Sequence, residues 1–118
     1  MCLEQLFDNE YKEEATNIGY KVFKIDGNKK LYSVDKCVYK SYKKRRWIHD
    51  NNDYCINGWY KTGFHVFLTR AAAIHYRSLG VPNYEVIYKV KFKNVVAYGS
   101  QLRHKVVVVR DMLIMEKI

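Results

Sequence analysis

The stretch from residue 63 to residue 92 constrains the fold most, because it has the pattern of a strand, a helix and a second strand. Residues 63–68 alternate apolar side chains with other residues, which is the period of a strand. Thr69 is a suitable N-cap for a helix over 69–79, and Gly80 follows as its stop. Residues 84–92 alternate again, with apolar side chains on one face and charged ones on the other, which predicts a half-buried strand.

The first third of the chain carries a helical pattern followed by a hairpin pattern. Apolar residues from Leu3 to Ala15 recur at three- and four-residue spacing, which predicts an N-terminal helix over 3–16. Residues 20–25 have the pattern of a strand, Asp26-Gly27-Asn28 is a turn signal, and 31–34 returns as the partner strand.

Polar and glycine-containing segments predict the remaining loops. The run 48–58 has loop chemistry, and Asn94 and Gly99-Ser100 are expected to be turns. Val106–Val109 and the residues after it form a final buried strand, or a bent pair of strands with Asp111 at the break.

These patterns together predict an α+β fold in one domain, residues 1–118. We expect a mainly antiparallel sheet of six to eight strands, an N-terminal helix and one helix near 69–79. A chain of 118 residues can bury one hydrophobic core. The longest apolar run is far shorter than a membrane span, and the acidic N-terminus resembles no export signal. We therefore expect no membrane partner and an intracellular location.

Charge is distributed unevenly along the chain. The formal net charge is +9. Residues 1–20 carry five acidic side chains and one lysine, whereas residues 21–46 carry ten basic side chains and two acidic ones. Two arrangements stay open: the two segments lie against each other, or the acidic segment shields the basic one.

The densest basic cluster is Lys43, Lys44, Arg45 and Arg46, followed at once by Trp47. Basic side chains bind phosphates and aromatic rings stack on bases, so this is the composition of a polyanion-binding surface. The alternative is a solvated, solubilising loop. Trp47, Trp59 and Tyr60 are the aromatic residues that we expect to stack.

The sequence offers no set of residues that supports catalysis. No Ser–His–Asp order, paired carboxylates or glycine-rich phosphate loop is present, which argues against hydrolysis. His49 and Cys55 lack a third and fourth metal ligand, so we expect neither a metal nor a cofactor. His65 either lies in a second buried layer, bonded to a backbone carbonyl, or forms a pocket with Tyr76. Three cysteines without a metal spacing are typical of free thiols in a reducing compartment.

The segment Gly63-Phe64-His65-Val66-Phe67, with the helix, the alternating strand, Ala97-Tyr98-Gly99 and the final strand after it, resembles small uncharacterised proteins of phages and viruses. This resemblance implies a virus-encoded accessory protein, which would act in the host cytoplasm or nucleus.

The same region has a more distant resemblance to the ADP-ribosyltransferase fold, in which 63–67, Tyr76 and 90–99 occupy matching places. Residues 20–25 lack the histidine of that family and 105–109 lack its glutamate. The resemblance therefore implies, at most, a fold that can bind a nucleotide.

From these observations we expect a non-enzymatic viral or mobile-element accessory protein that binds a polyanion, either nucleic acid or a nucleotide. Two alternatives stay open. One is a divergent ADP-ribosyltransferase-like enzyme that uses the pocket around His65 and Tyr76. The other is an interaction module that inhibits a host protein by docking its basic face on an acidic partner.

Overall fold

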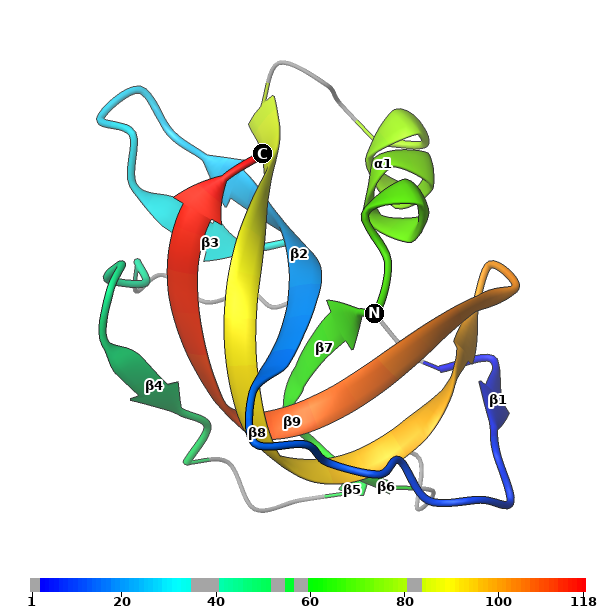
Figure 1. Ribbon diagram of the computed structural model, residues 1–118. Coiled ribbons are helices and arrows are strands. Elements are labelled where there is room, and N and C mark those ends of the chain that lie inside the picture. The colour runs from blue at the N-terminus through cyan, green and yellow to red at the C-terminus, as the bar shows by residue number, and fades with distance from the viewer. Residues whose placement is uncertain (1–2, 35–40, 52–54, 57–59, 81–83) are drawn as a thin grey trace.

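The computed structural model describes residues 3–34, 41–51, 55–56, 60–80 and 84–118. Within these ranges the chain forms nine strands and one helix (Figure 1). In order, they are β1 (Gln5–Leu6), β2 (Asn17–Ile25), β3 (Leu31–Ser33), β4 (Trp47–His49), β5 (Cys55–Ile56), β6 (Tyr60–Lys61), β7 (Phe64–Phe67), α1 (Arg70–Ser78), β8 (Glu85–Gln101) and β9 (His104–Lys117).

Seven of the strands form one antiparallel sheet in which four strands close on themselves. β8 pairs with β2, β2 with β7, β7 with β9, and β9 pairs back with β8. β1, β3 and β4 are added to β8, β2 and β9, and β5 and β6 form a separate pair. The predicted mainly antiparallel sheet is confirmed, with a single helix in the described residues.

β8 and β9 form a long bent hairpin, whose two halves lie in different parts of the closed sheet (Figure 1). The turns predicted at Asn94 and Gly99 are wrong, because β8 continues through both and the hairpin turns at Leu102 and Arg103. Asn94 instead has a positive φ of 60°, next to a register shift between Val95 and Ala97. Gly99 allows close approach of β1, since a Cβ there would collide with the Gln5 carbonyl oxygen.

The predicted central position of Val106–Val109 is confirmed, because all four side chains are fully buried. Val107 and Val109 pack inside the closed sheet with residues such as Phe23 and Phe92. Val106 and Val108 face a second cluster on the outer side, between the sheet and α1. A strand covered on both faces reads as a continuous apolar run rather than as an alternation.

The helix α1 begins at the predicted N-cap. The Thr69 hydroxyl oxygen accepts a hydrogen bond from the backbone N–H of Ala72 at 3.2 Å. Ala72 and Ala73 are buried against the sheet, and the Tyr76 ring packs beside Phe67 with centroids 5.4 Å apart. The helix therefore covers the end of the sheet where β2, β7 and β8 meet (Figure 1).

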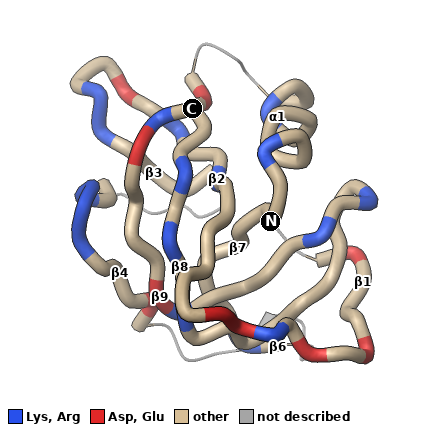
Figure 2. The backbone as a smooth tube through the Cα atoms, viewed as in Figure 1, with Lys and Arg blue, Asp and Glu red and all other residues tan. Residues whose placement is uncertain are grey.

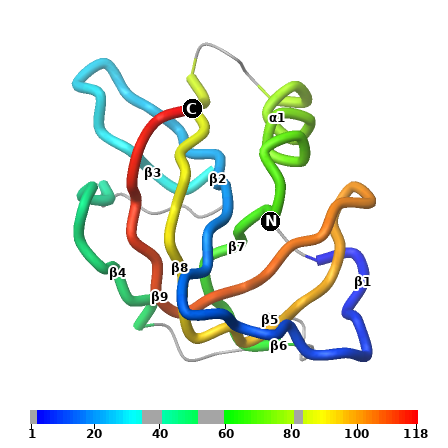
Figure 3. The backbone as a smooth tube through the Cα atoms, viewed as in Figure 1, coloured from blue at the N-terminus to red at the C-terminus, as the bar shows by residue number. Residues whose placement is uncertain are grey.

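The predicted N-terminal helix is wrong. Residues 5–6 are the strand β1, paired with Gly99 and Ser100 of β8, and the chain then runs across the sheet to β2 (Figure 3). The apolar residues that suggested a helix find partners in this extended path. The ring centroids of Phe7 and Tyr11 lie 4.8 and 5.6 Å from that of Tyr98. Helix propensity is a weak preference, and here strand pairing and aromatic packing override it.

The predicted loop over 48–58 is wrong in its first part. Trp47–His49 form the strand β4 on the edge of β9, and Ile48 packs against the core inside the sheet. Residues 55–56 pair with 60–61. Among the described residues, no helix is long and apolar enough to cross a membrane.

Candidate functional site

The basic segment Lys43–Arg46 lies immediately before β4, and all four of its side chains are exposed. The backbone N–H of Arg45 donates to the carbonyl oxygen of Ile114 at 2.9 Å, which fixes the segment to the end of β9. Arg45 has a positive φ of 62°, so the chain turns sharply there before it enters the strand. The four bases are therefore presented from an anchored turn.

β4, β9 and β8 lie side by side, and their register aligns outward-facing residues in two rows. Trp47, Leu113 and Lys91 are directly opposite one another in the first row. His49, Asp111 and Lys93 are opposite one another in the second row. Residues opposite each other in antiparallel strands point to the same face, so these six side chains share one surface.

Trp47 gives this surface an accessible aromatic ring. Trp47 is 44% exposed, although tryptophan is usually well buried in folded proteins. The ammonium group of Lys93 lies 4.2 Å from the centre of the Trp47 ring, a cation–π contact that holds both side chains in place. We define the basic face as Lys43–Arg46, Trp47, Lys91 and Lys93. Figure 2 shows its lysines and arginines in blue along β8 and in the segment that leads to β4.

A histidine and a carboxylate meet beside the basic face. The Nδ1 atom of His49 lies 2.8 Å from Oδ1 of Asp111, and the Asn94 side-chain amide donates to the other carboxylate oxygen. Burial raises the pKa of the Asp111 carboxyl, but the hydrogen bonds from Asn94 and His49 and the charge of Lys93 outweigh burial and hold that pKa below its ordinary value. Asp111 is therefore an anionic acceptor near neutral pH.

Two of the residues predicted to stack do not join Trp47 on this surface. Tyr60 is 5% exposed, and its hydroxyl group accepts a hydrogen bond from the backbone N–H of Leu3 and contacts Nε2 of His65. The expectation that Tyr60 stacks on a base is therefore wrong. Trp59 lies outside the described residues.

His65 and Tyr76, for which the sequence predicts a pocket, pack against Tyr60 and Phe67 respectively. His65 is 5% exposed and lies in the second buried layer, where Nε2 of its ring contacts the Tyr60 hydroxyl group. The His65 carbonyl oxygen in turn accepts a hydrogen bond from the buried ammonium group of Lys21 at 2.8 Å. Tyr76 packs on Phe67. Both residues have structural partners.

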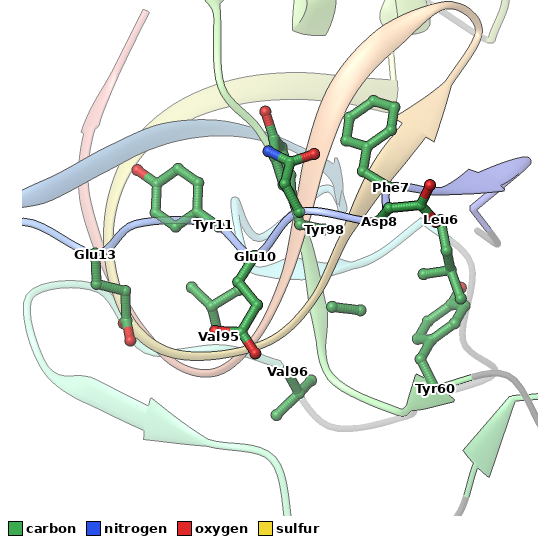
Figure 4. A pocket seen from close by; sticks show the side chains of 12 residues that line it. Leu6, Phe7, Asp8, Glu10, Tyr11, Glu13, Tyr60, Val95, Val96 and Tyr98 are labelled. Atoms are coloured by element: carbon green, nitrogen blue, oxygen red, sulfur yellow. The ribbon is translucent and has the colours of Figure 1, made fainter.

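A cavity of about 410 Å³ lies between the N-terminal segment and the second half of β8. Figure 4 shows Tyr11, Glu10 and Glu13 on the N-terminal side and Val95 and Tyr98 on the other. Burial and the neighbouring carboxylates of Glu14 and Glu13 raise the pKa of the Tyr11 hydroxyl, as expected in a negative environment. Such a cavity repels a phosphate group and is separate from the basic face.

The acidic N-terminal segment begins on the second half of β8 and ends beside its first half. In Figure 2 its tube runs from the lower right to the bottom centre, whereas the segment that leads to β4 lies at the left. Contact or shielding between the acidic segment and the basic segment 21–46 stays a prediction. Among the described residues, no three His, Cys, Asp or Glu side chains come together as metal ligands.

Comparison of the chain with family models, with curated proteins and with solved structures finds no match in any of the three. The resemblances to phage proteins and to ADP-ribosyltransferases therefore stay predictions.

Sequence reasoning found part of this surface and missed the rest. The alternation in 84–92 correctly placed Lys91 on a charged outer face, but nothing local indicated that β4 lies beside it. His49 and Asp111 are 62 positions apart and meet only through strand pairing. The interpretation of residues 48–58 as a loop hid the strand β4, whose pairing with β9 brings His49 beside Asp111.

Proposed function

We propose that this chain binds nucleic acid through the basic face. The observation that carries the proposal is the exposed Trp47 ring, which Lys93 contacts, in one row with Lys91 and directly after the four exposed bases of Lys43–Arg46. Basic side chains neutralise phosphates, and an exposed aromatic ring stacks on an unpaired base. The combination suits a single strand better than a duplex, because the bases of a single strand are free to stack.

The proposed contacts predict a specific salt dependence. Fluorescence anisotropy with a short single-stranded RNA, and with the DNA of the same sequence, should give affinities that fall linearly with salt on logarithmic axes. In the double variant Arg45→Ala/Arg46→Ala, the salt slope should decrease by about two, since each phosphate contact contributes about one. The variant Trp47→Ala should weaken binding by about 1–3 kcal/mol with little change in slope.

The turn between β2 and β3 provides a matched control. Lys29 and Lys30 are also adjacent and exposed, and Lys29 has a φ of 61°, close to the 62° of Arg45. The variant Lys29→Ala/Lys30→Ala removes the same charge from another part of the molecule and should leave the slope nearly unchanged. Equal effects of the two double variants would mean that net charge, and not the basic face, governs binding.

A further inference from the structure

The imidazole ring of His49 is hydrogen-bonded on one side and exposed to solvent on the other. Its Nδ1 atom is bonded to Asp111 at 2.8 Å, yet its side chain is 52% exposed while that of Asp111 is only 12% exposed. The other histidines of the chain differ in this respect. His65 is buried against Tyr60, and the rings of His75 and His104 bond each other at 2.9 Å. A ring fixed by a buried carboxylate and open on its other side is the arrangement of a general base.

The hydrogen bonds define which ring atom can take a proton. Asp111 is ionised near neutral pH and can only accept, so the hydrogen between the two groups is on Nδ1 of His49. A neutral His49 ring then carries its lone pair on Nε2. The Asn94 amide occupies the second carboxylate oxygen, which keeps Asp111 from rotating away. Asn94 reaches it from a backbone with φ of 60°, an uncommon conformation that this contact helps to explain.

The neighbours of His49 are an aromatic ring and a basic side chain, the two kinds of group that bind a nucleic acid strand. Lys93 lies two strands away in the same row, with Asp111 between them. Its ammonium group is near enough to Asp111 to influence the carboxylate and also contacts the Trp47 ring. Trp47 is two residues before His49 on the same face of β4. A base on Trp47 and a phosphate at Lys93 would therefore flank the His49 ring.

We propose that His49 is the general base of an RNA-cleaving site on the basic face, with Asp111 as its positioning residue and Lys93 as a phosphate-binding residue. This inference rests on the proposed nucleic-acid binding and adds a substrate class and a reaction to it. RNA is required because DNA lacks the 2′-hydroxyl group from which His49 would take the proton.

The reaction is an internal transesterification. Nε2 of His49 removes the proton of a 2′-hydroxyl group, whose oxygen attacks the adjacent phosphorus atom. The 2′-oxygen–phosphorus bond forms as the bond from phosphorus to the 5′-oxygen breaks, and the proton on His49 passes to that 5′-oxygen. The products are a 2′,3′-cyclic phosphate and a 5′-hydroxyl end. Lys93 would stabilise the negative charge that develops on the phosphoryl oxygens.

The test is cleavage of an end-labelled single-stranded RNA by the whole chain, in buffer with EDTA and under conditions where binding is saturated. The wild type should give products with 2′,3′-cyclic phosphate ends and should not cut an RNA with 2′-deoxyribose at the cleaved position. His49→Ala should reduce the rate about 100-fold or more while it leaves RNA affinity unchanged, and added imidazole should restore part of the rate. His75→Ala, which removes another exposed histidine, should cleave like the wild type.

Asp111→Asn tests the positioning role separately. It should lower the maximal cleavage rate and leave the RNA concentration at half-maximal rate unchanged, and circular dichroism at the assay temperature should show that the variant is as folded as the wild type. RNA that is bound but not cut by the wild type would overturn the inference and leave the proposed function intact. Cleavage that persists in His49→Ala would overturn it as well, and absence of RNA binding at low salt would overturn both proposals.

Discussion

Asp111 is the residue on which the polar contacts beside the basic face converge. It lies on β9 between His49 of β4 and Lys93 of β8, and it also accepts a hydrogen bond from Asn94. Its carboxylate is buried and is compensated by donors and positive charge from two strands. Removing that charge should therefore weaken the attachment of the edge strand β4, which has no other strand partner among the described residues.

The lowered pKa of Asp111 predicts how its contribution depends on pH. A carboxyl group whose pKa is lower in the folded state stabilises the fold above its unfolded pKa, and this stabilisation is lost as the pH falls through the folded pKa. Asp111→Asn should lower the free energy of unfolding by about 1–2 kcal/mol near neutral pH, because a charged hydrogen bond becomes a neutral one. Urea unfolding at about pH 7 and about pH 3 should show a smaller difference between the two proteins at the acidic pH.

Glu116→Gln is the comparison for that measurement. Glu116 is 64% exposed and pairs with Lys89 only at 3.8 Å. An exposed pair of this kind contributes little, so this variant should differ from the wild type by less than about 0.5 kcal/mol. A loss in Asp111→Asn that is equally large at both pH values would show that packing, and not charge, is responsible.

At the scale of elements, the sequence predicted the parts whose signals are local. The alternation in β7 and the Thr69 cap of α1 each depend on adjacent residues, and both are confirmed. The alternation in the first half of β8 is confirmed from Val86 to Phe92, but Tyr84 is exposed and Glu85 is buried, against the prediction. The errors occur where pairing with a strand that is distant in sequence determines the local structure. Residues 3–16 pair and pack on the second half of β8, and β4 exists because β9 lies beside it.

The pairing between β2 and β7 is the shortest in the closed sheet, since it consists of one residue pair, Tyr20 and Phe67. Gly19 lies beside this point. A Cβ on Gly19 would collide with the Val66 side chain and would lie 2.8 Å from the Phe67 carbonyl oxygen. Gly19→Ala should therefore destabilise the protein by about 1–3 kcal/mol, the usual cost of excess volume in a packed core.

Thermal unfolding followed by circular dichroism would measure this effect. Gly27→Ala is the control, because nothing lies within 4 Å of a Cβ added at that position in the β2–β3 turn. The two variants add the same methyl group, so they separate crowding from the general effect of replacing glycine. If both melted at the same temperature as the wild type, β2 and β7 would not be packed as closely as described.

At the scale of the whole molecule, charge is divided between two regions. The principal dimensions are 41 × 30 × 27 Å, and the acidic N-terminal segment begins at the lower right of Figure 2, whereas the segment that leads to β4 lies at the left. Exposed charges separated by more than about 8 Å interact weakly at physiological salt. We therefore expect that the acidic residues of the cavity do not compete with nucleic acid for Lys43–Arg46.

The double variant Glu10→Gln/Glu13→Gln tests this separation. Both residues line the acidic cavity and are exposed. At about 0.15 M salt, where charges are screened beyond about 8 Å, their removal should leave the RNA affinity nearly unchanged in the anisotropy assay. A large gain in RNA affinity would instead indicate that the acidic segment shields the basic face.

The long β8–β9 hairpin also has a consequence for the order of folding. Its strands are neighbours in sequence, so they can pair early and with little loss of loop entropy. β2 must then find the first half of β8 across most of the chain, while β7 joins β9. Long-range pairing of this kind slows the rate-limiting step of folding. We therefore expect that a chain in which β2 has not yet paired exposes an unpaired hydrophobic strand, and that such a chain is more prone to aggregate than the native protein.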